Sequence, residues 1–144
     1  MSEQLVAGAT VYRKRNGSPP LWLVIKNEQD GDWELPKGLV RRGESSVGSI
    51  LRILREEGGM VVEIIEEAGR ATASRTKNGS RSTDKIIFYL SEMHSSLFSE
   101  SIYYTQEKWL AYSRAKKALG LEREKRILKQ ANDTLKECLK KRKN

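Results

Sequence analysis

Short apolar stretches alternate with polar turns in the first part of the chain. Residues 6–12 and 21–25 are apolar and rich in β-branched and aromatic side chains, which predicts two strands. The segment between them contains Asn16-Gly17 and Pro19-Pro20, pairs that are typical of turns. We therefore expect a hairpin. Residues 33–36 predict a brief extended piece closed by a proline, which cannot continue a hydrogen-bonded ladder.

The apolar spacing changes to a helical period at residues 45–57. The positions i, i+3, i+4 and i+7 of one predicted apolar stripe are Val47, Ile50, Leu51 and Leu54. Gly58 and Gly59 follow, and paired glycines are a common end of a helix. This segment predicts a helix with one face against a core.

The second half of the chain returns to strands and then becomes helical. Residues 60–65 and 85–90 predict strands, with a turn at Asn78-Gly79 between them. A last strand is predicted to end near Trp109-Leu110. Helical periodicity follows at residues 114–119, breaks at Gly120 and resumes as a basic amphipathic helix at about 121–142. The order of elements predicts a single domain, 1–144, of mixed α/β or α+β class.

Composition fits this interpretation and narrows the class of protein. The 144 residues are 38% hydrophobic and 32% charged, which is typical of a globular domain with its own core. No apolar run approaches the roughly 20 residues of a membrane span. The N-terminal segment lacks the pattern of a secretory signal, so we expect a cytoplasmic protein.

Single cysteine and histidine residues restrict the metal chemistry. Cys138 and His94 are the only residues of their kinds, which excludes an internal disulfide and zinc sites built from several such side chains. A bound metal would need mainly oxygen ligands, which favours Mg²⁺ or Mn²⁺.

The formal charge of +8 favours a polyanionic partner, either a phosphorylated small molecule or nucleic acid. Much of the excess lies at the C-terminus, where a solvated helix end is the simpler interpretation and RNA contact the alternative. A second basic stretch comprises Arg70, Arg75, Lys77, Arg81 and Lys85. It either flanks a long phosphate chain or is a solvated hairpin.

Residues 38–60 combine a glycine-bounded loop with a helix that ends in acidic residues. Glu56 and Glu57 offer oxygen ligands, and Arg52 lies one turn before Glu56, where it can pair with it. Glu44 stands at the helix entrance, where negative charge is favoured. Positive charge and backbone freedom in the loop come from Lys37, Gly38, Arg41, Arg42 and Gly43. Each feature alone is common on solvated surfaces, so only their joint spacing is informative.

That spacing resembles the signature of the Nudix (MutT-like) hydrolase family. The signature positions are occupied by Gly38, Glu44, Arg52, Leu54, Glu56, Glu57, Gly59 and Met60. The stretches AGATVYR, WELPKG and Trp109-Leu110 also suit the family's arrangement, so the resemblance covers nearly the whole chain. WELPKG is most similar to the dinucleoside polyphosphate hydrolases and to the inositol-polyphosphate branch.

The resemblance implies an α/β/α sandwich with a mixed sheet, and hydrolysis of a nucleoside diphosphate linked to another group with Mg²⁺ or Mn²⁺. Glu56 and Glu57, with Gly38, would hold the metal, and Arg52 and Glu44 would support them. Residues expected near the substrate are Lys37, Arg41 and Lys85, with Trp33 or Tyr89 stacking on a base or serving as core aromatics.

The chain departs from the family at Ile53, where a metal-binding glutamate is expected. Three outcomes follow: another acid supplies the base, the enzyme is slow, or the protein binds its ligand without cleaving it. Glu107 and Glu100 are the candidate acids. The expected substrate is a dinucleoside polyphosphate such as diadenosine tetraphosphate. The alternatives are an RNA 5′-end pyrophosphohydrolase and a nucleotide- or RNA-binding module, and the oligomeric state stays open.

Overall fold

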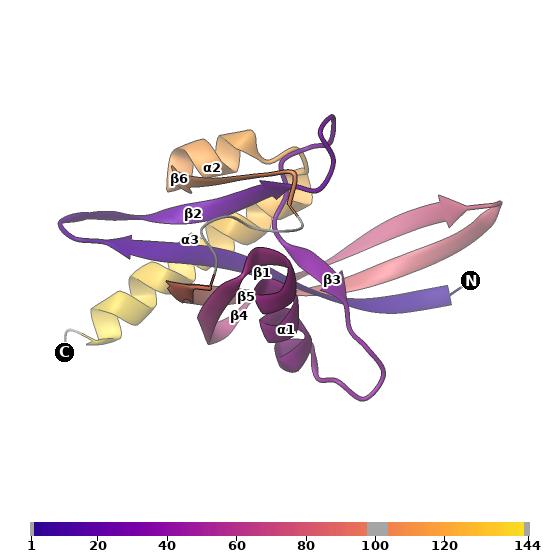
Figure 1. Cartoon of the computed structure of the whole chain (residues 1–144), viewed down its shortest axis with the longest axis horizontal. Helices are drawn as coiled ribbons and strands as arrows, with labels where there is room; N and C mark the ends of the chain where they lie inside the picture. The colour runs from indigo at the N-terminus through magenta and orange to yellow at the C-terminus, as the bar shows by residue number, and fades with distance from the viewer. Residues whose placement is uncertain (1, 98–103, 143–144) are drawn as a thin grey trace.

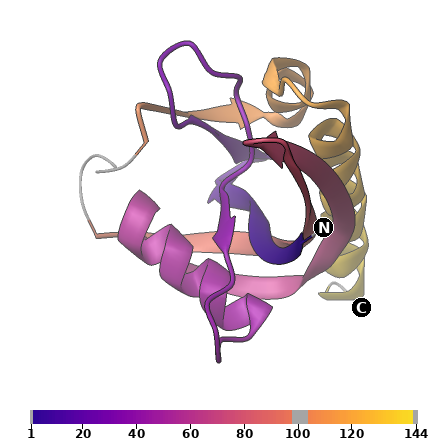
Figure 2. The same cartoon turned by 90° about the vertical axis from the view of Figure 1, so that its right-hand side faces the viewer.

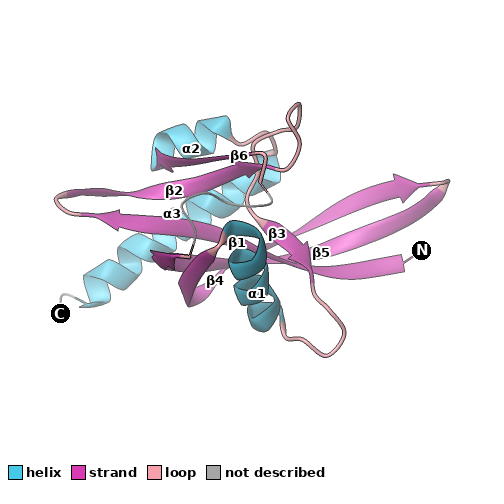
Figure 3. Cartoon of the chain, in the orientation of Figure 1, coloured by secondary structure: helices cyan, strands magenta, loops and turns pink. Residues whose placement is uncertain are grey.

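A computed structural model describes residues 2–97 and 104–142. The elements in chain order are β1 (Ser2–Arg15), β2 (Ser18–Lys26), β3 (Lys37–Leu39), α1 (Ser46–Gly58), β4 (Met60–Lys77), β5 (Ser80–Ser96), β6 (Gln106–Ala111), α2 (Tyr112–Ala118) and α3 (Glu122–Arg142) (Figure 1). Figure 3 shows how strands and helices are distributed along the chain.

The strands of the described residues form one mixed sheet of six strands, five in the order β4-β5-β1-β2-β6 and the sixth, β3, paired with β1 off this path. β1 is central. It pairs in parallel with β5 on one edge, and antiparallel with β2 and β3 on the other. The hairpin predicted between the first two strands is confirmed, with its turn at Asn16 and Gly17.

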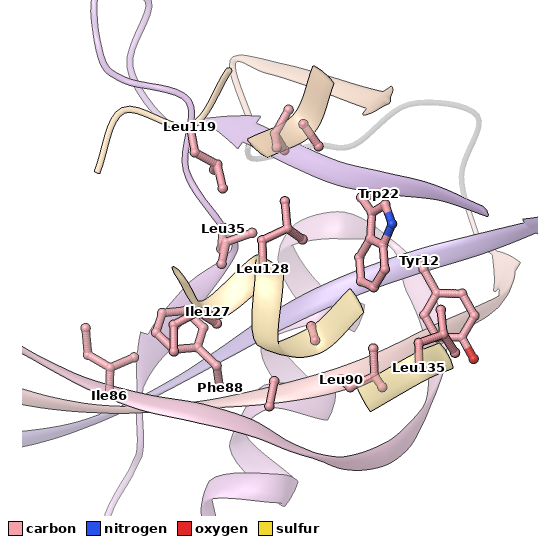
Figure 4. Packing of buried hydrophobic residues seen from close by; sticks show 14 of the residues in the cluster. Tyr12, Trp22, Leu35, Ile86, Phe88, Leu90, Leu119, Ile127, Leu128 and Leu135 are labelled. Atoms are coloured by element: carbon pink, nitrogen blue, oxygen red, sulfur yellow. The ribbon is translucent and has the colours of Figure 1, made fainter. Parts of the chain in front are cut away.

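Helices cover both faces of this sheet (Figure 2). On β1, side chains alternate between two cores, because successive residues of a strand point to opposite faces. Ala7, Ala9 and Val11 pack with α1, whereas Val6 and Tyr12 pack with α2 and α3. Figure 4 shows the second core, where Trp22 and Phe88 of the sheet meet Leu128 and Leu135 of α3. The predicted α/β/α sandwich is confirmed.

Turn chemistry at the end of the long β4–β5 hairpin also agrees with the prediction. Asn78 and Gly79 both have positive φ angles, 53° and 78°. Asparagine and glycine tolerate that region, and two such residues form the tight turn whose twist suits a hairpin. The polar residues on both sides of this turn, expected to be strand residues, continue β4 and β5 up to the turn, where Lys77 pairs with Ser80.

The brief extended piece predicted at 33–36 is present as two isolated bridges, at Trp33 and Glu34, and Pro36 takes no part in a ladder, as expected. A new strand, β3, begins at the next residue and pairs with Val6–Gly8 of β1. Pro36 donates no hydrogen bond, but its carbonyl accepts one from the backbone of Ala9 at 3.0 Å. Pro36 therefore lies beside β1, where the backbone N–H of Ala9 is satisfied by the Pro36 carbonyl.

The predicted apolar stripe of α1 is rotated in the structure. Ile50 and Leu54 are buried as expected, but Val47 and Leu51 are 37% and 38% exposed. Ile53, only 3% exposed, takes the remaining core position. Ile53, the residue at which the chain departs from the family signature, is therefore also a core residue.

Among the described residues, no helix has the length and apolar character needed to cross a bilayer. The cytoplasmic location stays a prediction.

Candidate active site

Local sequence fixes both ends of α1. The Ser45 hydroxyl accepts a hydrogen bond from the backbone N–H of Gly48 at 2.9 Å, which satisfies a donor in the first turn. At the other end Gly59 has φ 62° and its N–H returns to the carbonyl of Arg55. The left-handed conformation suits glycine. These caps place Glu56 and Glu57 in the last turn of the helix.

Glu44 and Arg52 form the best-defined contact of the loop. Arg52 donates to Glu44 twice, from Nε to Oε2 at 2.8 Å and from Nη2 to Oε1 at 3.0 Å. The Ser49 hydroxyl and the backbone N–H of Arg41 also donate to Glu44, at 2.8 and 3.1 Å. These donors, Arg52 first, lower the pKa of Glu44 to about 2. The carboxylate fixes the loop to the helix.

Arg52 extends this network toward the strand and the end of the helix. Its Nη2 donates to the carbonyl of Leu39 at 3.2 Å, and its Nη1 lies 3.5 Å from Glu56 Oε2. Hydrogen bonding to Glu44 raises the pKa of the Arg52 guanidinium. The predicted pairing of Arg52 with Glu56 is present, but the bidentate contact with Glu44 is the shorter one.

This network predicts a measurable acid sensitivity. Glu44 has a lower pKa in the folded protein than the ordinary value of 4.5, so its stabilising contribution is complete above pH 4.5 and is lost as the pH falls toward about 2. We expect Glu44→Gln to flatten the fall in unfolding free energy over that range, measured by urea denaturation at a series of pH values. Glu137→Gln, an exposed glutamate on α3, is the control. Parallel curves for wild type and Glu44→Gln would contradict the assignment.

A cleft of about 410 Å³ opens beside this network, between β3, the loop and α1. The residues that line it include Gly38, Arg41, Arg52, Ile53, Glu56 and Glu57. The structure thus brings together six residues that the signature places within 20 positions of one another. The cleft joins a positive side, from Arg41 and Arg52, to a negative side at the end of α1.

Glu57 is the residue of this cleft whose environment favours a bound cation. Its side chain is half-buried, and among the described residues no hydrogen bond or ion pair reaches its carboxylate. Burial raises the pKa of Glu57, the nearby Arg52 charge lowers it, and Glu56 raises it further. A half-buried carboxylate with this balance is stabilised in its charged form by a positive ion.

Ile53 occupies the floor of the cleft. A Cβ added at Gly38 would lie 2.8 Å from Ile53 Cδ1, so glycine is what allows β3 to approach this side chain. Ile53 therefore packs where the resemblance implies a third acid, and the cleft holds two carboxylates of α1 instead of three.

Lys37 and Trp33 lie outside this cleft. Lys37 Nζ contacts Glu34 Oε1 at 2.8 Å, the Leu35 carbonyl at 2.9 Å and Glu124 Oε2 at 2.9 Å. The Lys37 ammonium group is therefore directed into the protein. Trp33 packs against the core on the α3 side. Its ring is 4.9 Å from the ammonium groups of both Lys26 and Lys108.

Tyr89 and Lys85 lie on the α1 side of β5. Tyr89 is buried in the α1 core, and its hydroxyl is 2.5 Å from that of Ser46. Lys85 is exposed, lies 3.5 Å from Glu3 and borders a separate hollow of about 320 Å³ with Arg70 and Leu5. The backbone carbonyl of Leu5 accepts from Val40, directly after β3, so this hollow neighbours the loop.

Of the two candidate catalytic bases, only Glu107 lies within the described residues. Glu100 lies outside the described residues. Glu107 is on β6, paired with Ile25, and does not line the cleft. However, Glu57 and Glu107 both raise the pKa of the buried Tyr104 hydroxyl, so the two acids approach the same tyrosine from different elements. Burial is the larger cause of that rise.

Sequence reasoning missed Ser49, the Leu39 carbonyl and Glu124 as parts of this region. Ser49 and Leu39 contact the Glu44–Arg52 pair, and Glu124 contacts Lys37 from α3. No periodic or motif signal marks these contacts. Only the charge of Glu124 within an otherwise apolar seam of the last helix would have drawn attention to it.

The NUDIX domain family matches residues 3–131, which is most of the chain. This chain belongs to the Nudix family. The resemblance drawn from residues 38–60 is confirmed, and with it, at the level of the family, the prediction of a hydrolase acting on phosphoanhydride bonds.

Solved structures agree on the Nudix fold. A Caenorhabditis elegans Ap4A hydrolase in a binary complex superposes with a TM-score of 0.72 at 22% identity, covering 92% of this chain and 97% of that one. A NUDIX hydrolase from Nitrosomonas europaea gives 0.71 at 13% identity, covering 92% and 90%. The Escherichia coli dihydroneopterin triphosphate pyrophosphohydrolase gives 0.63 at 12%, covering 90% and 97%. No curated protein sequence matches this chain.

Nudix hydrolases generally use divalent metals, and the cleft fits one in part. Glu57 offers a half-buried carboxylate that no other described residue contacts by a hydrogen bond or ion pair, and Glu56 offers an adjacent carboxylate; both suit a hard cation. Within the described residues, no three histidine, cysteine or acidic side chains are grouped as a complete metal site. A cation bound in this Nudix cleft would need further ligands from backbone oxygens, water or substrate phosphates.

Proposed function

We propose that this Nudix domain is a divalent-metal-dependent pyrophosphohydrolase that cleaves a nucleoside diphosphate linked to another group. The observation that carries the proposal is the half-buried carboxylate of Glu57, which has no hydrogen-bond or ion-pair partner among the described residues and lies in a cleft bordered by Arg41 and Arg52. This arrangement combines acidic groups for a cation with guanidinium groups for a phosphate chain, as hydrolysis of a pyrophosphate requires.

Each residue has a distinct proposed role. Glu56 and Glu57, with the backbone of Gly38, would hold Mg²⁺ or Mn²⁺, which when bound polarises a phosphoryl oxygen and activates water. Arg52 acts through Glu44, because their bidentate contact fixes the loop against the helix. The exposed Arg41 is the group that meets substrate phosphate. Glu107 is the proposed second acid, approaching Glu57 across Tyr104.

The first substrate to test is a dinucleoside polyphosphate such as diadenosine tetraphosphate. The structural likeness to an Ap4A hydrolase supports this choice. The hollow that contains Arg70 and Lys85, on the same side of the sheet as α1, gives a long phosphate chain a second basic region to follow. The proposed substrate is therefore longer than a simple nucleoside triphosphate.

A screen of nucleotides with Mg²⁺, Mn²⁺ and EDTA tests this function, with products separated by anion-exchange chromatography. Diadenosine tetraphosphate, nucleoside triphosphates, nucleotide sugars and a 5′-triphosphorylated RNA form the panel. We expect cation-dependent cleavage, greatest with the dinucleoside polyphosphate. No cleavage of any member with either cation would contradict the hydrolase proposal.

Ile53 supports a second candidate, a nucleotide- or RNA-binding module of the same fold without turnover. A buried isoleucine cannot ligate a metal, so the cleft has one acid fewer than the family signature implies. Equilibrium binding of a nucleotide without cleavage, unchanged by Glu57→Gln, would favour this module over the enzyme.

Substitution of Ile53 tests whether a third acid completes the metal site. We expect Ile53→Glu to destabilise the metal-free protein by about 2–4 kcal/mol, because it removes apolar packing and buries a carboxylate. Mn²⁺ should then raise the melting temperature of Ile53→Glu much more than that of wild type, and turnover should rise if the natural site is only weakened.

Ile53→Gln is the matched control, since it is similar in size and polar but uncharged. The two variants should be destabilised alike without metal and should differ in their response to Mn²⁺. An equal response in both would show that no cation binds beside residue 53.

A further inference from the structure

A separate cleft of about 290 Å³ lies between β4 and α3. Its apolar members, Ala71 and Ile127, belong to the core on the α3 side of the sheet, whereas Ile53 and the metal candidates belong to the α1 side. Figure 2 shows α1 and α3 on opposite sides of the sheet. This cleft is therefore distinct from the candidate active site.

The polar lining of this cleft is strongly basic. Its polar residues are Arg70, Thr72, Arg123, Arg126 and Gln130, with no carboxylate among the lining residues. Arg70 also donates to Glu67, at 2.9 Å from Nη2, so its charge is partly compensated. Within the described parts of the chain, no side-chain hydrogen bond or ion pair engages Arg123 or Arg126.

The environment of Arg123 independently favours a bound anion. Its Nε is buried and has no hydrogen-bond partner among the described residues. A buried donor without an acceptor is costly, and such groups in folded proteins are usually satisfied by a ligand, an ion or water. The guanidinium fork matches phosphate oxygens in geometry as well as in charge.

The shape of the cleft depends on a glycine. Gly69 precedes Arg70 on β4, and a Cβ there would collide with Gln130 and Ile127 of α3. Without that side chain the helix lies close to the strand, so Arg123 and Arg126 of α3 border the cleft together with the backbone of residues 70–72 on β4. The Arg70 side chain points to the other face, because Arg70 pairs with Ile87, which packs on the α1 side. Among the described residues, no aromatic side chain lines the cleft, so these residues offer no surface on which a base could stack.

We propose that this cleft binds a phosphate chain, such as inorganic polyphosphate or the terminal phosphates of a small molecule. Arg123 and Arg126, one turn apart on α3, suit a ligand with several negative charges. None of the described residues that line the cleft is aromatic, which favours the phosphates over a base as the recognised group. The site does not rest on the proposed hydrolysis, because Arg123 and Arg126 lie on the opposite face of the sheet from the cleft with Glu56 and Glu57, although the site adjoins the hollow beside Lys85 through residues 70–72.

Binding of inorganic tripolyphosphate in EDTA, measured by isothermal titration calorimetry on the full chain, tests the proposal without requiring turnover. We expect Arg123→Gln/Arg126→Gln to weaken binding about tenfold or more, since each variant side chain loses a charged hydrogen bond. The matched control is Lys136→Gln/Lys140→Gln, which removes the same charge from exposed positions of the same helix. Arg126→Gln alone, at an exposed position, serves if the double variant does not fold.

Three results would overturn the proposal. Equal weakening by the arginine and lysine variants would indicate non-specific attraction to a basic helix. Weakening only by Arg41→Gln or Lys85→Gln would place the ligand on the α1 side. RNA binding that requires Arg123 and Arg126, with no affinity for tripolyphosphate in wild type, would identify a nucleic-acid surface instead.

Discussion

Lys37→Met is expected to destabilise the protein by about 3–5 kcal/mol, because it leaves a buried carboxylate without its counter-charge. Glu124 is fully buried, and its Oε1 accepts from the backbone N–H of Leu35 at 2.8 Å. Its other oxygen lies 2.9 Å from Lys37 Nζ, an ion pair without the alignment of a hydrogen bond. Chemical denaturation of the variant and the wild type measures the loss.

Two further variants test whether the loss of stability comes from burial of the Lys37–Glu124 pair. Lys37→Met/Glu124→Leu should recover part of the stability, because it removes both charges rather than one. Lys129→Met is the matched control, since Lys129 and Asp133 are 3.0 Å apart but more than half exposed; it should cost less than about 0.5 kcal/mol. Similar losses in Lys37→Met and Lys129→Met would contradict the role of burial.

This ion pair also bears on the candidate site. Residues 34–37 lead directly into Gly38, whose backbone borders the cleft, and Glu124 holds them from α3. The last helix therefore stabilises the approach to the active site although none of its residues lines that cleft.

Glu57→Gln is expected to lower turnover of the first accepted nucleotide substrate by about a hundredfold or more, a barrier increase of roughly 2.7 kcal/mol. Glutamine keeps the size of the side chain but removes the charge that would hold the cation. The measurement is kcat at saturating Mg²⁺ and at saturating Mn²⁺.

Stability of this variant should not fall. Burial raises the pKa of Glu57, which means that the fold disfavours its charged form, and neutral glutamine removes that cost. Loss of turnover with an unchanged or higher melting temperature would thus report on chemistry. Glu137→Gln, exposed on α3, controls for the loss of one negative charge. Full activity of Glu57→Gln would refute a role for this carboxylate at the metal site.

The sequence alone determined the features that depend on neighbouring residues. Ser45 and Gly59 bound α1 because a serine oxygen and a left-handed glycine satisfy helix ends locally. Asn78 and Gly79 set the β4–β5 turn for a similar reason. The spacing from Gly38 to Met60 identified the family. The same contiguous segment supplies the acids and arginines that line one cleft.

Only the tertiary structure decided the features that depend on distant contacts. β3 exists because three residues meet the edge of β1, and propensity over so short a segment carries little information. The burial of Ile53 follows from the approach of β3 to α1, and the enclosure of Lys37 follows from Glu124, 87 residues further along the chain. Such contacts form when the sheet and its two helical layers pack, and no local pattern records which residues that packing will bring together.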